Sequence, residues 1–279
     1  MIKRIFLFIA ASLIAGFVLA PFFLQAKAEA FAVSRGEAIV EVSSGRLLYS
    51  DNGDRQLPPA STTKILTALI IAEDCDPNAV VAVPESAAGT EGSSVYLVAG
   101  EKLTVRDLLY GLMLRSGNDC AVTLALHHSG SIPAFAECMN MRARALGAEH
   151  SHFENPHGLP AEGHYTTARD LAVIAAAALQ NETVSKIVGT EKYTVPDGGC
   201  GYVRVWQNKN KMLYNYEGAD GVKTGYTKEA GRCLVTSATR GNMRLVCAVL
   251  NSPNMYERSG ELLDCCFAKY SMKQLFRAD

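Results

Sequence analysis

Residues 61–64 read Ser-Thr-Thr-Lys, and the apolar spacing of the residues that follow predicts a helix beginning at Ser61. Three residues along a helix bring Lys64 onto the same face as Ser61, within hydrogen-bond reach. A lysine there can be the base that a serine nucleophile needs, and the N–H groups at a helix start favour a developing oxyanion. The alternative is that Ser61 only caps the helix and Lys64 is solvated. Alone the motif is weak, because one match is expected about once by chance in a chain this rich in serine and lysine.

Two more short motifs follow in the chain. Ser116-Gly117-Asn118 comes directly after a predicted helix, and by itself it is typical of a helix C-terminus with polar turn residues. Lys223-Thr224-Gly225 lies within a strand-like run, where by itself it indicates a strand end with an exposed lysine. Each motif alone has an ordinary structural explanation. The three together, in this order, favour catalysis.

The remaining sequence changes from strand patterns to helix patterns and back. Strands are predicted at 36–50, 191–195, 203–206, 221–227 and, as a hairpin, 233–250; helices are predicted at 61–72, 104–114, 121–127, 132–146, 166–179 and 256–270. This order predicts one sheet assembled from both ends of the chain, with a helical lobe inserted.

The N-terminus is typical of an export signal, with a basic start, an apolar run over residues 5–24 and small residues behind it. We expect residues 1–28 to be a signal peptide, cut after Ala28 or Ala30, and residues 29–279 to form one two-lobed catalytic domain without a C-terminal β domain. A retained anchor is the alternative, because the run is nearly long enough to span a bilayer. Either way, the protein is expected in the extracytoplasmic cell envelope or secreted. Membrane association stays open, since the C-terminal tail is too short to predict an anchor.

Composition excludes several classes of protein. The 279 residues are 48% hydrophobic and 20% charged with a net charge of -1, which is typical of a folded domain rather than a disordered or fibrous chain. Nucleic acid is not an expected partner, because phosphate binding needs a clear basic excess. The eight cysteines include no Cys-x-x-Cys pair, and several lie in apolar runs, so we expect buried free thiols, although an even number permits disulfides.

The motifs Ser-x-x-Lys, Ser-x-Asn and Lys-Thr-Gly, in this order, are shared by penicillin-binding proteins and serine β-lactamases. The sequence resembles the D-alanyl-D-alanine carboxypeptidases, or low-molecular-mass penicillin-binding proteins, over about residues 31 to 270. The runs that carry the resemblance are 59–64, 116–119, 155–159, 164–172 and 220–227. It implies an α/β fold with an antiparallel sheet flanked by helices, an inserted helical lobe, and the site in the cleft between them.

The resemblance implies a serine D,D-carboxypeptidase that removes the terminal D-alanine from peptidoglycan stem peptides in cell-wall maturation. Ser61 would form the acyl-enzyme after Lys64 takes its proton, helped by repulsion between Lys64 and Lys223. Ser116 would relay a proton to the leaving amine, and Asn118 would bind Lys64 and the substrate amide. β-Lactams, which mimic D-Ala-D-Ala, would trap Ser61. No cofactor and no metal are implied.

The resemblance also implies residues that bind the substrate. The strand carrying Lys223, Thr224 and Gly225 would pair with the peptide backbone, with Gly225 allowing close approach. The N–H groups of Ser61 and Tyr226 would form the oxyanion hole, and Lys223 and Thr224 would lie near the terminal carboxylate. Arg258 is placed where the family has a carboxylate-binding arginine; the alternative is that it pairs with Glu261 or Glu257 on its own helix.

Three rival functions have weaker support. A class A β-lactamase needs a Glu-x-x-x-Asn loop, but the fourth residue after Glu154 is Gly158. A zinc enzyme could use His150 and His152, yet no His-Glu-x-x-His motif occurs. A non-catalytic wall-binding module would be expected to lack one of the catalytic residues, and all are present. Cys120, two residues after Asn118, is close enough to the predicted site for its thiol reactivity to matter.

Overall fold

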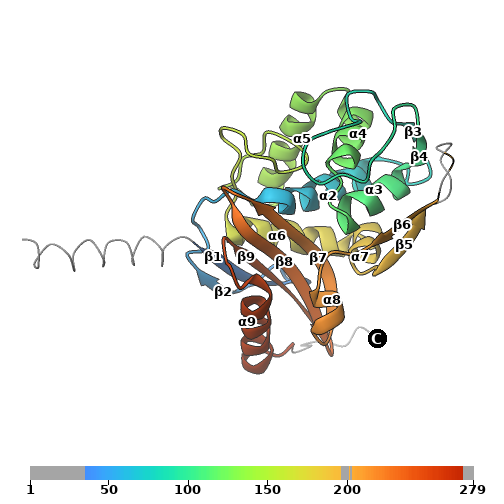
Figure 1. Cartoon of the computed structure of the whole chain (residues 1–279). Coiled ribbons are helices and arrows are strands. Elements are labelled where there is room, and N and C mark those ends of the chain that lie inside the picture. Colours follow the sequence, from blue (N-terminus) through green and yellow to red (C-terminus); the bar gives the residue numbers. More distant parts are fainter. Residues whose placement is uncertain (1–34, 196–200, 202, 273–279) are drawn as a thin grey trace, which may run out of the picture. The chain divides into compact units, whose positions relative to one another are not determined.

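The main sheet is antiparallel and takes its strands from both ends of the chain (Figure 1). The computed structural model describes residues 35–195, 201 and 203–272. The sheet has five strands in the order β2-β1-β9-β8-β7. Their bounds are β1 (Gly36–Glu41), β2 (Leu47–Asp51), β7 (Ala219–Thr227), β8 (Gly231–Arg240) and β9 (Met243–Leu250). Strand β7 is an edge strand, so one row of its backbone N–H and C=O groups is not used by the sheet.

Both faces of this sheet are buried, which explains why its central strands are apolar throughout. In β9, Val246 and Ala248 face one core, while Leu245 and Cys247 face the other. Helix α6 (Ala168–Gln180) packs against β1 and β9 on the first face, and α9 (Met255–Lys269) packs against β8 and β9 on the second. The predicted α/β fold with an antiparallel sheet and a helical lobe is confirmed.

The helical lobe is built around α2, which is buried along most of its length. The helices are α2 (Lys64–Asp74), α3 (Val105–Leu114), α4 (Asn118–Ser129), α5 (Ile132–Ala145) and α7 (Glu182–Val188). Helix α2 contacts α3, α4, α5 and, on the sheet side, α6. The lobe is therefore tied to the sheet through the helix that begins at Lys64 (Figure 1).

Four short elements were not predicted. Strands β3 (Val80–Ala82) and β4 (Lys102–Thr104) pair with each other, while α7 and α8 (Met212–Asn215) are helices of seven and four residues. Such lengths are too short for a periodic signal. The predicted strands β5 (Lys192–Val195) and β6 (Arg204–Gln207) are present, but they form a separate two-stranded ribbon rather than part of the main sheet.

Seven cysteines lie within the described residues, and none of the seven is in a disulfide. Four of them are buried as expected, whereas Cys265 is exposed and Cys75 and Cys138 are half-buried. Cys200 and the predicted signal peptide, residues 1–28, lie outside the described residues. Across the described segments, no single helix has the length and apolar character to cross a membrane; only the sharply bent pair α6–α7 does so by length and composition.

Candidate active site

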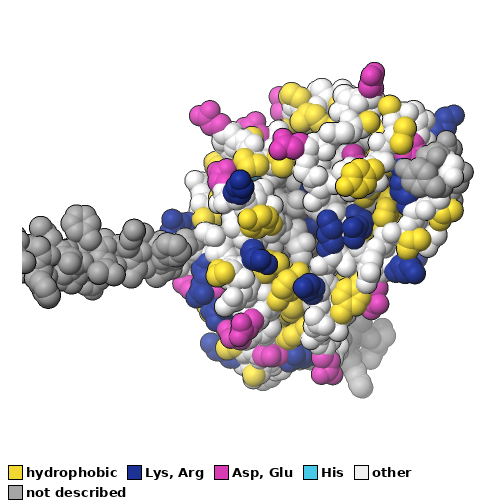
Figure 2. All heavy atoms as spheres, in the orientation of Figure 1, with side chains coloured by type: hydrophobic (Ala, Val, Ile, Leu, Met, Phe, Trp, Pro, Cys, Tyr) yellow, Lys and Arg dark blue, Asp and Glu magenta, His cyan; other side chains and the backbone are white. Residues whose placement is uncertain are grey.

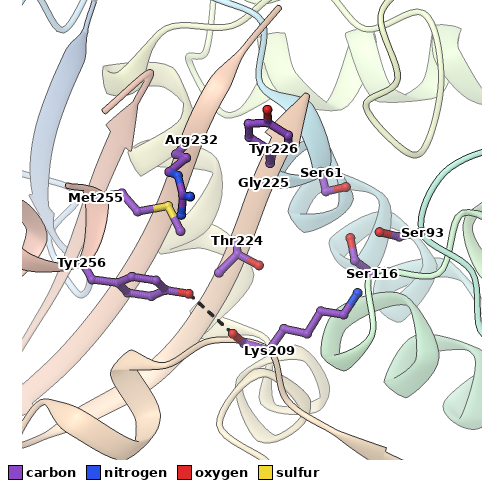
Figure 3. Close-up of a pocket in the computed structure, with 10 residues that line it drawn as sticks. All are labelled: Ser61, Ser93, Ser116, Lys209, Thr224, Gly225, Tyr226, Arg232, Met255 and Tyr256. Atoms are coloured by element: carbon purple, nitrogen blue, oxygen red, sulfur yellow. Dashed lines mark hydrogen bonds between the residues drawn. The ribbon is translucent and has the colours of Figure 1, made fainter. Parts of the chain in front are cut away.

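Ser61 lies in a 3-10 turn, η1 (Ala60–Thr63), rather than in the first turn of an α-helix as predicted. This turn leads directly into α2, whose first residue is Lys64. Ser61 lines a cleft of about 370 Å³ together with Ser93 and Ser116 of the helical lobe (Figure 3). The opposite wall comes from β7, β8 and the start of α9, so the cleft lies between the two lobes as the resemblance implied.

Lys64 is fully buried beneath Ser61, and three oxygens surround its amine. The Nζ atom lies 3.0 Å from Ser61 Oγ, 2.7 Å from Asn118 Oδ1 and 2.7 Å from the backbone carbonyl oxygen of His157. Asn118 Oδ1 and the His157 carbonyl can only accept hydrogen bonds. A neutral Lys64 amine would donate its two protons to them, and its lone pair would then face the Ser61 hydroxyl.

Burial lowers the pKa of Lys64 well below its usual value, and the nearby Lys223 ammonium lowers that pKa further. The sequence prediction that Lys64 can lose its proton thus has structural support. However, burial is the larger cause and repulsion from Lys223 the smaller one. A lysine that is neutral for part of the time can accept the Ser61 proton.

The carbonyl that holds Lys64 belongs to a loop fixed by its own hydrogen bonds. Asn155 Oδ1 accepts from the Gly158 backbone N–H at 2.7 Å, and Thr67 Oγ1 donates to the Pro156 carbonyl at 2.7 Å. Gly158 has a φ of +87°, and a Cβ added there would lie 1.8 Å from the Ala60 carbonyl oxygen. This loop therefore packs against η1 without room for a side chain at position 158.

Ser116 lies in the turn between α3 and α4, beside Ser61 and Ser93 at the cleft (Figure 3). Its φ is +65°, which is uncommon for a residue with a side chain and is found where a structure constrains a functional group. The Ser116 hydroxyl oxygen is buried and has no hydrogen-bond partner within the described residues. The hydroxyl is thus available to a group that enters the cleft.

Asn118 connects Lys64 to the loop that carries Glu91 and Ser93 at the rim of the cleft. Besides accepting from Lys64, it donates from Nδ2 to the Glu91 carbonyl at 2.6 Å, and its backbone N–H donates to the Ser93 carbonyl at 2.7 Å. These bonds place Ser93 at the cleft. The next residue, Asp119, is fully buried and accepts from backbone N–H groups of the same rim, including that of Leu97 at 3.0 Å.

Strand β7 brings the third motif to the cleft. Lys223 is buried rather than exposed, and its Nζ donates to the Thr224 carbonyl at 3.0 Å. Burial and, to a smaller extent, the nearby Lys209 ammonium lower the pKa of Lys223 to about 7. Thr224, Gly225 and the exposed Tyr226 line the cleft. A strand end with an exposed lysine is therefore the wrong description of this motif.

Gly225 lies where the edge strand passes closest to the nucleophile. A Cβ added to Gly225 would be 3.1 Å from both the Pro59 carbonyl oxygen and the Ser61 backbone nitrogen. The backbone of β7 thus lies directly beside η1. This arrangement brings the backbone N–H of Ser61 near the edge strand that also carries Tyr226.

Arg258 is not among the residues that line this cleft, and its binding of a substrate carboxylate stays a prediction. It forms two hydrogen bonds of 2.9 and 2.8 Å with the carboxylate of Glu37, a fully buried residue of β1. A further ion pair joins Arg258 to Glu261 at 3.1 Å. The alternative prediction, that Arg258 pairs with an acid on its own helix, is therefore right for Glu261. The pairing of Arg258 with Glu37 was not predicted.

Five residues that line the cleft were not predicted from the sequence: Ser93, Lys209, Arg232, Met255 and Tyr256. No motif signals any of them. Lys209 lies in a polar run that reads as a solvated loop, and Arg232 follows a turn between two strands. In the space-filling view, basic side chains gather around the hollow in the middle of this face, whereas acidic ones lie mostly toward its periphery (Figure 2).

The residues on which the rival functions would depend do not line the cleft. Glu154 is exposed, pairs with His152 at 2.9 Å and does not line the cleft. Within the described residues, no group of three or more His, Cys, Asp or Glu side chains has an arrangement that could hold a metal. Burial, followed by the charge of Asp119, raises the pKa of the Cys120 thiol well above its usual value, so this thiol stays protonated and unreactive.

Two histidines beneath the site are expected to make stability depend on pH. Burial lowers the pKa of His157 to about 3 and that of His164 to about 4, with smaller contributions from Lys64 and His152 respectively. The unfolded chain takes up these protons below about pH 6.5. Stability should be greatest above that pH and fall toward pH 4, by at most about 1.4 kcal/mol per pH unit for each histidine.

Urea unfolding between pH 4.5 and 7.5 measures this effect. His164→Gln should reduce the slope of the unfolding free energy against pH, because it removes one of the two histidines that have a lowered pKa. An unchanged slope in the variant would contradict the assignment of His164.

The sequence matches the D-alanyl-D-alanine carboxypeptidase family, peptidase family S11, over residues 25–254. The chain belongs to this family. It is 38% identical to the D-alanyl-D-alanine carboxypeptidase DacF of Bacillus subtilis over 253 residues, which is 88% of this chain and 64% of DacF.

Solved structures of family relatives have the same fold. A mutant of the Streptomyces K15 DD-transpeptidase superimposes with a TM-score of 0.79 at 33% identity, over 84% of this chain and 97% of that one. The D-alanyl-D-alanine carboxypeptidase of Mycobacterium tuberculosis also gives 0.79, at 34% identity, over 84% and 90% of the two chains. The chain spans less than two thirds of DacF, so its activity is inferred below from its own site.

Proposed function

We propose that this protein is a serine D,D-carboxypeptidase that removes the terminal D-alanine from peptidoglycan stem peptides, and that β-lactams inhibit it. The observation that carries the proposal is the buried Lys64 amine 3.0 Å from Ser61 Oγ at the floor of a cleft. Family membership supports the same chemistry. The apolar N-terminus supports an extracytoplasmic location, where stem peptides occur, and a role in cell-wall maturation.

Acylation begins with proton transfer from the Ser61 hydroxyl to neutral Lys64. Ser61 Oγ attacks the carbonyl carbon between the two D-alanines and forms a tetrahedral intermediate. The peptide bond then breaks, and a proton passes from Lys64 to the leaving nitrogen through the unpartnered Ser116 hydroxyl. D-Alanine leaves as a free amino acid, and the shortened peptide stays as an ester on Ser61.

The edge of β7 orients the peptide for this attack. An extended peptide adds to the strand beside Thr224 and Gly225 and uses backbone groups that the sheet leaves unpaired. Close packing of Gly225 against Ser61 supports an oxyanion hole made of the Ser61 and Tyr226 backbone N–H groups. Deacylation repeats the chemistry with water as nucleophile and Lys64 as base, and it restores the Ser61 hydroxyl.

Release of D-alanine from a peptide that ends in D-Ala-D-Ala tests the proposal. We expect release from this peptide and none from a matched peptide that ends in D-Ala-L-Ala. A second reaction with an added amine acceptor detects transpeptidation, since the fold is shared with the Streptomyces K15 DD-transpeptidase. Product joined to the acceptor, with no free shortened peptide, would contradict carboxypeptidase activity and favour a transpeptidase.

A further inference from the structure

His164 is a buried side chain that joins the two segments on either side of Lys64. Its Nε2 atom lies 3.0 Å from the hydroxyl oxygen of Thr63, the last residue of the turn η1. Its Nδ1 atom accepts the backbone N–H of Glu154 at 3.0 Å, in the loop that also carries the His157 carbonyl. His164 therefore connects the turn that carries Ser61 to the loop that holds the Lys64 amine.

These two contacts fix the tautomer and the direction of the His164 ring. Burial and, to a smaller extent, His152 lower the pKa of His164 to about 4, so the ring is neutral near pH 7. Because Nδ1 accepts a hydrogen bond, the proton of the neutral ring is on Nε2. Nε2–H thus donates to the buried Thr63 hydroxyl oxygen. The ring of Phe153 packs edge-on against the imidazole, with 5.7 Å between the ring centres.

Thr63 is the point at which η1 meets the loop. It is 1% exposed and directly precedes Lys64. A Cβ added to Gly158 would lie 2.8 Å from Thr63 Oγ1, so the backbone of the loop packs directly against this hydroxyl. A displacement of the Thr63 hydroxyl would therefore affect both the start of the Lys64 helix and the loop carbonyl that accepts from its amine.

The loop has further anchors, but these lead to other elements. Asn140 of α5 pairs with the backbone of Phe153: its Nδ2 donates to the carbonyl at 2.9 Å, and its Oδ1 accepts from the N–H at 2.8 Å. Thr67, one helical turn beyond Lys64, donates to the Pro156 carbonyl. These bonds fix the loop to α5 and to α2, whereas the bonds of His164 fix it to η1.

We infer that His164 is a positioning residue for acylation: its hydrogen bond to Thr63 keeps the Lys64 amine within reach of the Ser61 hydroxyl. The inference rests on the proposed function, in which Lys64 takes the Ser61 proton. Proton transfer requires hydrogen-bond distance between the two groups, and a misplacement of about 1 Å can cost about a hundredfold in rate. His164 does not line the cleft, so its loss should slow acylation without weakening the initial binding of substrate.

The test uses substitutions that each keep one of the two bonds. Asparagine places an amide oxygen near the position of Nδ1, so His164→Asn keeps the bond from Glu154 and loses the bond to Thr63. Glutamine places an amide nitrogen near the position of Nε2, so His164→Gln keeps the bond to Thr63. We expect His164→Asn to lower the maximum rate of acylation by benzylpenicillin about tenfold or more, with an unchanged dissociation constant, and His164→Gln to stay within about twofold of wild type.

Variants of Thr63 test the same bond from its other end. Thr63→Val removes the acceptor and should slow acylation as much as His164→Asn does, whereas Thr63→Ser keeps the hydroxyl and should acylate like the wild-type protein. The double variant His164→Asn, Thr63→Val should be no slower than either single variant, because both remove one interaction. Urea unfolding measures the stability of each variant. Acylation rates that follow stability rather than the Thr63 bond, or losses that add in the double variant, would overturn the inference.

The same proteins separate this inference from the proposed function. If wild type is acylated and releases D-alanine, but His164→Asn and His164→Gln acylate at equal rates, the inference is wrong and the function stands. If wild type is acylated without releasing D-alanine, the function is wrong and the acylation rates still decide the inference. If wild type is not acylated, hydrogen exchange at the Lys64 backbone N–H, which donates within η1, decides it. This exchange should be faster in His164→Asn than in His164→Gln, and equal exchange would overturn both.

Discussion

Replacing Lys64 by methionine is expected to slow acylation of Ser61 by about 10²- to 10⁴-fold, the usual contribution of a general base. Methionine fills most of the buried volume of the lysine but cannot accept a proton. It also leaves Asn118 Oδ1 and the His157 carbonyl without the donor that both now share. The measurement is the rate at which a fluorescent penicillin labels the protein, together with the rate of D-alanine release.

Lys228→Met is the matched control, because Lys228 is an exposed lysine that does not line the cleft. Its acylation rate should equal that of the wild-type protein. A folded Lys64→Met protein with an acylation rate near wild type would show that another group removes the Ser61 proton.

Gly158→Ala is expected to destabilise the protein by at least about 4 kcal/mol, which is rare for a single methyl group. The new Cβ would lie 1.8 Å from the Ala60 carbonyl oxygen, an atom of the backbone of η1 that cannot rotate away. Either η1 or the loop that holds Lys64 must move, so acylation should be lost together with stability. Urea unfolding and penicillin labelling measure the two effects.

Gly130→Ala separates crowding from backbone strain. Gly130 also has a positive φ, +73°, but nothing lies within 4 Å of an added Cβ. Its substitution should cost only the strain of a left-handed residue, about 1–2 kcal/mol. Equal losses of stability in the two variants would contradict the account of Gly158 as a packing position.

Much of the site was predictable because each motif is local and its residues stay together in the fold. Ser61 and Lys64 are three residues apart, so even the change from an α-helix to a 3-10 turn leaves Nζ within 3.0 Å of Oγ. Strand β7 was predicted at 221–227 and is observed at Ala219–Thr227, and the motif places Lys223 and Thr224 within it. How the motifs meet in space followed from the family resemblance alone.

Arg258 shows why a main contact of a predicted site residue could not be found from the sequence. Sequence spacing reveals neighbours on one helix, such as Glu261, but Glu37 is 221 residues away. Its pairing with Arg258 depends on how α9 packs against the sheet. Arg232 was not predicted for the same reason, because it reaches the cleft only through the register of β8 on β7.

The electrostatics of Lys64 also required the structure. Sequence indicated the second cation, Lys223, but not the burial of both amines. Burial is the larger cause of the lowered pKa of Lys64 and of Lys223. The burial of Lys64 results from the packing of α2 against five other helices, α3, α4, α5, α6 and α7, which no single stretch of sequence shows.

Intact mass after incubation with benzylpenicillin tests the central claim, that Ser61 is the nucleophile. We predict a mass increase of one penicillin molecule per chain, located on Ser61 by peptide mapping and absent from Ser61→Ala. A folded protein without an adduct, or an adduct that persists in Ser61→Ala, would contradict the account. Hydrolysis of penicillin with no lasting adduct and no D-alanine release would instead favour a β-lactamase.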